Sequence, residues 1–96
     1  MLTGDDKKKM VARLKRIEGQ VAGIQRMVES ETYCINVLHQ FSAVQGALAS
    51  AAQGILSAHL NTCVHQAFLE GDEIEREAKL TELMTIFAKY GSVLEK

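Results

Sequence analysis

Apolar residues recur along most of this chain at alternating spacings of four and three, the period of an amphipathic helix. Residues 5–29 carry the first such stripe, which consists of Met10, Leu14, Ile17, Val21, Ile24 and Val28. A second stripe fills residues 33–69 and consists of Val37, Phe41, Val44, Leu48, Ala51, Ile55, His59 and Cys63. A third, in residues 74–90, consists of Leu80, Leu83, Met84 and Phe87. The pattern predicts an all-α protomer of three helices that forms one domain over residues 1–96.

The breaks between the stripes carry turn and capping residues. Residues 30–32 (Ser-Glu-Thr) separate the first two helices, and Thr32 is placed to cap the second one. Residues 71–72 (Gly-Asp) are expected to end the second helix, and Gly91 to stop the third. The chain contains no proline. Nothing in the composition therefore opposes long helices.

The second helix is unusually long for so short a chain. At over thirty residues it extends for about 50 Å, and 96 residues cannot surround such a rod. Its apolar stripe must be shared with a second copy of the chain. Residues 46–52 (Gly-Ala-Leu-Ala-Ser-Ala-Ala) are small enough for two helices to cross closely. We therefore expect an antiparallel, two-fold symmetric pair with its axis near residues 47–48.

Two cysteines and one histidine form a candidate metal site. His59 and Cys63 are four residues apart, so they share one helix face. Cys34 lies roughly 37 Å from His59 along a straight helix, and one chain cannot close the site. In the antiparallel pair, however, Cys34 of one copy lies beside residue 61 of the other. Two thiols and an imidazole suit Cu(I) or Zn(II), and the lack of a fourth protein ligand favours Cu(I).

The same three residues have simpler interpretations. A buried cysteine is often a small apolar residue, and His59 on an apolar stripe is compatible with a core histidine. Cys34 and Cys63 are also able to form a disulfide. That is less favoured here, because the chain has neither a membrane-length apolar run nor an apolar signal segment, and we expect a cytoplasmic protein with reduced thiols.

Basic residues are concentrated at the start of the chain, although the net charge is −1. Seven of the 11 lie within residues 7–26, and none lies within residues 27–75. Residues 70–77 are instead strongly acidic. The first helix is thus a candidate surface for a polyanion, although a solvated helix face has the same composition.

Several segments together closely resemble the CsoR family of bacterial copper-sensing repressors. They are residues 13–29, Tyr33-Cys34-Ile-Asn-Val-Leu, Gln40-Phe-Ser-Ala-Val-Gln and His59-Leu-Asn-Thr-Cys63, and the likeness covers about residues 8–88. It implies antiparallel four-helix-bundle dimers, a disc-like homotetramer made of two dimers, and a repressor that leaves operator DNA when it binds Cu(I). The derepressed genes would be those of copper resistance.

The resemblance also implies roles for individual residues. Cys34 of one protomer joins His59 and Cys63 of its partner as metal ligands, while Tyr33 and Glu82 hydrogen-bond the remaining nitrogen of His59. Residues 1–10 hold no histidine, unlike nickel and cobalt sensors of the family, and persulfide sensors lack the histidine present here at position 59. The ligand pattern therefore points to copper.

DNA contacts are expected on the first helix, because the middle of the second helix lacks basic residues. Lys9, Arg13 and Arg16 share one flank of the helical wheel, with Gln20 beside them. Two other functions stay open: a repressor triggered by thiol oxidation or persulfidation, and a copper-buffering helical protein that does not bind DNA. No catalytic constellation stands out, so we do not expect an enzyme.

Overall fold

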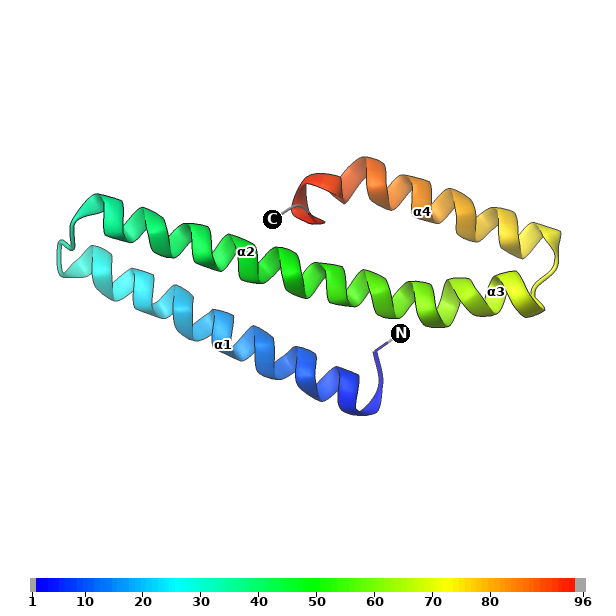
Figure 1. Ribbon diagram of the computed structural model, residues 1–96, viewed down its shortest axis with the longest axis horizontal. Coiled ribbons are helices and arrows are strands. Elements are labelled where there is room, and N and C mark those ends of the chain that lie inside the picture. Colours follow the sequence, from blue (N-terminus) through cyan, green and yellow to red (C-terminus); the bar gives the residue numbers. More distant parts are fainter. Residues whose placement is uncertain (1, 95–96) are drawn as a thin grey trace.

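One long helical rod spans the protein, with a shorter helix along part of each side, and the molecule is open and elongated (Figure 1). The structure is a computed structural model that describes residues 2–94. Helix α1 spans Gly4–Glu29 and α2 spans Cys34–His59. A five-residue π-helical turn, η1 (Leu60–Val64), and α3 (His65–Glu70) continue α2, and α4 spans Glu73–Leu94. The prediction of an all-α, three-helix protomer is confirmed, because α2, η1 and α3 form one continuous rod.

The core lies between α1 and α2, which pack as an antiparallel hairpin. Every second member of the α1 stripe is buried, namely Met10, Ile17 and Ile24. They pack with Val44 and Ala51 of α2 and with the partly buried Val37, so both helices contribute residues seven positions apart. A seven-residue period returns side chains to the same face of a helix. One seam of packed side chains therefore holds the hairpin together.

The other half of each stripe remains exposed. On α1, the side chains of Leu14, Val21 and Val28 are 43%, 49% and 60% exposed. On α2, Phe41, Leu48 and Ile55 are exposed to a similar degree and also lie seven positions apart. We call these six residues the open seam. The hairpin thus leaves a second row of apolar side chains on each helix outside its own packed seam.

The two loops confirm the expected breaks between the helices, but the expected cap at Thr32 is not formed. Glu31 adopts a positive φ of 57° and turns the chain between α1 and α2. The Thr32 cap was a wrong prediction, since Tyr33 occupies the N-cap position of α2 without a side-chain cap bond and the Thr32 hydroxyl instead meets Ser30 Oγ at 3.2 Å. Gly71 ends α3, as expected.

Helix α4 folds back along the distal half of the rod, on the side opposite α1 in Figure 1. Its start is capped by Asp72, whose Oδ1 accepts a hydrogen bond from the Glu75 backbone N–H at 2.8 Å. Gly91 does not stop the helix, which continues to Leu94. An isolated glycine costs a helix only about 1 kcal/mol, so the expected stop at Gly91 was wrong.

The whole molecule is thin for its length. It measures 58 × 29 × 14 Å, and its radius of gyration is 17.6 Å, whereas a compact domain of about 100 residues has roughly 13 Å. None of the described side chains is less than 2% exposed. Within residues 2–94, no helix is long and apolar enough to cross a membrane.

Candidate metal centre and nucleic-acid interface

His59 is held by a carboxylate of α4. Its Nε2 lies 2.9 Å from Glu82 Oε1, and Lys79 Nζ lies 3.7 Å from the other oxygen of the same carboxylate. The imidazole ring therefore has one nitrogen occupied, which leaves Nδ1 to act as a ligand. A carboxylate on the far nitrogen is the usual way in which a metal-binding histidine is oriented. Glu82 thus contacts His59, and its role behind a metal-bound His59 stays a prediction.

Cys63 lies one turn beyond His59, inside the π-helical turn η1. The Thr62 hydroxyl lies 3.7 Å from Cys63 Sγ and lowers the pKa of the thiol, and the positive charge of Lys79 adds to this. The hydroxyl has a single proton, and the Ala58 carbonyl, 2.7 Å from Thr62 Oγ1, is the second acceptor within its reach. Single π turns within α-helices are frequent at functional sites. Sequence reasoning missed η1, because its residues also fit an ordinary helix.

Cys34 lies at the other end of α2. It is the first residue of the helix, His59 is the last, and Tyr33 precedes them both (Figure 1). Cys34 and Cys63 are not joined in a disulfide, and Tyr33 is 70% exposed. Accordingly, no group of three or more His, Cys, Asp or Glu side chains in residues 2–94 of a single chain is placed to hold a metal ion. The structure brings Glu82 of α4 to His59, with Cys63 one helical turn further along, and keeps Cys34 and Tyr33 at the other end of α2.

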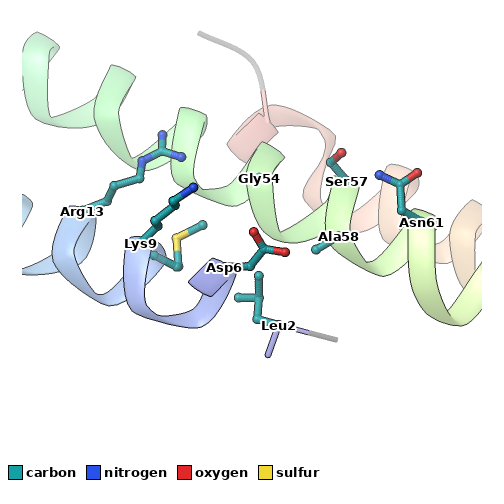
Figure 2. Close-up of a pocket in the computed structure, with 9 residues that line it drawn as sticks. Leu2, Asp6, Lys9, Arg13, Gly54, Ser57, Ala58 and Asn61 are labelled. Atoms are coloured by element: carbon teal, nitrogen blue, oxygen red, sulfur yellow. The ribbon is translucent and has the colours of Figure 1, made fainter. Parts of the chain in front are cut away.

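The expected nucleic-acid contacts lie together on α1. Lys9, Arg16 and Gln20 are exposed, whereas Arg13 is half-buried. Lys9 and Arg13 line a groove of 330 Å³ between the start of α1 and the stretch of the rod where α2 passes into η1. Figure 2 shows Asp6, Lys9 and Arg13 rising from α1 toward α2, with Ser57 and Asn61 opposite. The groove combines two cations, one carboxylate and uncharged polar groups.

Arg13 has a partner that sequence reasoning did not find. Its Nη2 donates a hydrogen bond to Ser50 Oγ of α2 at 2.8 Å. Ser50 stands in a run of small residues, and nothing local to that run indicates which residue of another helix faces it. Only the packing of α1 on α2 identifies the pair.

Two cysteines and a carboxylate-held histidine, on a helical scaffold with a basic first helix, define a metal-responsive nucleic-acid-binding protein. The model of the metal-sensitive transcriptional repressor family matches residues 6–89. The chain belongs to this family. Its members are DNA-binding repressors and not enzymes, as the sequence predicted.

Individual relatives and solved structures agree with the family. The chain is 45% identical over 85 residues to the copper-sensing transcriptional repressor CsoR of Bacillus subtilis, with 88% of this chain and 81% of that protein covered. It is 48% identical over 77 residues to the copper-sensing repressor RicR of Mycobacterium tuberculosis, with 80% and 79% covered.

Two solved structures share the fold. The copper-sensing repressor CsoR with Cu(I) from Geobacillus thermodenitrificans superposes with a TM-score of 0.84 at 40% identity, over 95% of this chain and 93% of that one. The nickel-responsive transcriptional regulator InrS superposes with a TM-score of 0.75 at 38% identity, over 91% and 98%. The resemblance to the CsoR family that the sequence suggested is confirmed.

Proposed function

We propose that this protein is a copper(I)-responsive transcriptional repressor that acts in the cytoplasm. Without metal it binds operator double-stranded DNA, and on binding Cu(I) it dissociates and derepresses copper-resistance genes. The observation that carries the proposal is the placement of Cys34 at one end of α2 and of His59 and Cys63 at the other. Such a ligand set is completed only between two chains, so metal binding is coupled to quaternary structure.

The open seam supports the antiparallel dimer. Phe41 and Ile55 lie seven residues on either side of Leu48, so the exposed α2 residues match themselves across a two-fold axis at Leu48. Cys34 lies fourteen residues before Leu48, and the residue fourteen positions after it is Thr62, next to Cys63. The axis expected near residues 47–48 and the exposed side chains therefore agree. Two such dimers would form the homotetramer.

The donor set fits Cu(I). Two sulfur atoms and the His59 Nδ1 atom are soft or borderline ligands, and the pKa of Cys63 is already lowered toward the thiolate by the Thr62 hydroxyl. Bound Cu(I) would supply bonds from Cys34 of one protomer to His59 and Cys63 of the other. Tyr33 would arrive with Cys34 and, together with Glu82, hold the ring of His59.

The metal ligands and the DNA-facing groove share one stretch of the rod. His59 lies between Ser57 and Asn61, both of which line the groove beside Lys9 and Arg13. His59 also connects this stretch to α4 through Glu82. A reorientation of the His59 ring would act directly on α4, and on the groove through the helix backbone that carries Ser57 and Asn61. Linkage requires that DNA weaken Cu(I) binding by the same factor by which Cu(I) weakens DNA binding.

The deciding experiment titrates a complex of the repressor and the DNA upstream of its own gene with Cu(I), Zn(II), Ni(II) and a persulfide donor under strict reduction. We expect Cu(I) alone to release the DNA stoichiometrically. Release by Ni(II) would indicate a nickel sensor similar to the nickel-responsive regulator. A protein that does not bind this DNA at all would instead be a copper buffer.

The shared site has its own test. Mixing Cys34→Ala with Cys63→Ala protein should give hybrid dimers that each retain one intact Cu(I) site, whereas each variant alone has none. Absence of restored binding in the mixture, despite subunit exchange, would contradict the assignment of ligands from two protomers.

A thiol-responsive repressor is the second candidate, because the lowered pKa of Cys63 favours the reactive thiolate. In the antiparallel dimer, Cys34 of the partner would lie close enough to trap an oxidised or persulfidated Cys63. Release of DNA by the persulfide donor, with Cu(I) inactive, would favour this candidate.

A further inference from the structure

The position of the Arg13 guanidinium is set by α2 and not by α1, the helix that carries it. Arg13 Nη2 donates to Ser50 Oγ at 2.8 Å across the helix interface, in a half-buried setting. Gly54 follows one turn later, where a Cβ would lie 3.5 Å from Arg13 Nη1 and 3.2 Å from Met10 Cε. The side chain thus lies along α2, next to a hydroxyl that accepts its hydrogen bond and a glycine that leaves it room.

The charge of this guanidinium remains available to an external anion. No carboxylate among residues 2–94 pairs with it, although Asp6 lines the same groove. A guanidinium has five N–H donors, and Ser50 accepts from one of them. Arg13 therefore presents a held positive charge at the groove, with the exposed Lys9 beside it, and such charge is the chemistry that recognises a DNA phosphate.

We propose that Ser50 is a positioning residue for DNA binding and that it acts through Arg13. The proposal rests on the DNA-binding role assigned to Arg13 above and adds a residue from a helix without basic side chains in that region. A free arginine loses much rotamer freedom when it binds a phosphate, whereas one already held at its position loses less. Ser50 already orders the Arg13 side chain in the folded protein. DNA binding therefore costs less side-chain entropy.

A double-mutant cycle tests the proposal, with fluorescence anisotropy of the DNA upstream of the gene measured across a range of salt concentrations. Ser50→Ala should weaken DNA binding by about fivefold, the effect of losing one ordinary hydrogen bond. Its salt dependence should stay that of wild type, because the cation is still present. Arg13→Ala should weaken binding and also flatten the salt dependence. The double variant should bind like Arg13→Ala, since Ser50 then has nothing to position.

Two further variants separate positioning from general effects on the fold. Ser50→Thr keeps a hydroxyl at the position and should restore wild-type affinity. Ser42→Ala removes another α2 hydroxyl, which is exposed and does not line the groove, and should leave DNA binding unchanged. Circular dichroism of all variants checks that the hairpin is folded.

Each other outcome overturns a defined part of the argument. Wild-type affinity in Ser50→Ala, with weakened binding in Arg13→Ala, would remove the positioning role and leave the function intact. An equal loss from Ser50→Ala in both backgrounds would show that Ser50 acts through the fold and not through Arg13. Wild-type binding by Arg13→Ala would remove the DNA role of Arg13 itself, and the proposal with it.

Discussion

At the scale of single residues, the contact between His59 and Glu82 has the most direct consequence for metal binding. We predict that Glu82→Gln weakens Cu(I) binding by about ten- to a hundredfold, the usual effect of losing a carboxylate behind a metal-binding histidine. The amide retains the shape but not the negative charge that lies 2.9 Å from Nε2. Competition with a Cu(I) chelator measures the change. Glu77→Gln, an exposed acid on the same helix, is the control and should bind Cu(I) as wild type does.

The Thr62 hydroxyl sets the reactivity of a second ligand. Its contact with Cys63 lowers the pKa of the thiol in the folded protein, so the thiolate forms at a lower pH than in the unfolded chain. We predict that Thr62→Val raises this pKa, so that alkylation of Cys63 reaches half its maximal rate at a higher pH. The pH profile of reaction with iodoacetamide, in a Cys34→Ala background, measures the shift.

Thr85→Val is the matched control for Thr62→Val. The Thr85 hydroxyl donates to the Thr81 carbonyl within α4, and its loss should leave the alkylation profile in place. If Thr62→Val had the profile of Thr85→Val, the hydroxyl would not be the cause of the lowered pKa.

At the scale of elements, the turn between α3 and α4 determines where Glu82 lies. A Cβ added to Gly71 would meet the Ala67 carbonyl oxygen and Glu75 Oε2, each at 2.5 Å. We predict that Gly71→Ala destabilises the fold by about 1–3 kcal/mol, since the backbone oxygen cannot move aside without opening the turn. Urea unfolding followed by circular dichroism measures the change.

Substitution of Gly19 by alanine is expected to have the opposite effect on the free energy of unfolding. Gly19 lies in the middle of α1 with nothing within 4 Å of an added Cβ. Gly19→Ala should therefore stabilise the protein by about 0.5–1 kcal/mol through helix propensity alone. Equal stabilities of the Gly71 and Gly19 variants would argue against the close turn.

At the scale of the whole molecule, the open seam predicts obligate association. We expect Leu48→Glu to place two like charges at the two-fold axis and to yield monomers in analytical ultracentrifugation. Because Cys34 then has no partner chain, the variant should also lose tight Cu(I) binding. Ser42→Glu adds the same charge to α2 outside both seams and should leave the assembly intact. A monomeric protein that still bound Cu(I) tightly would contradict the shared site.

Much of this architecture follows from local pattern. The four-and-three spacing of apolar residues located all three helices, and the expected segment of residues 33–69 agrees within one residue with the rod that ends at Glu70. The cap at Thr32 and the stop at Gly91 failed, because single-residue signals at helix ends compete with packing. The extent of one domain over residues 1–96 and the shared metal site stay predictions.

The sequence by itself determined the helices and the wide separation of Cys34 from His59 along the second one, because these follow from helical period and rise alone. The second chain that this separation calls for stays a prediction. Only the tertiary structure decided which half of each apolar stripe is buried, that Glu82 of α4 holds His59, and that Ser50 holds Arg13. Those pairings join residues 23 and 37 positions apart. They depend on how helices fold back and pack, which no periodicity within one helix specifies.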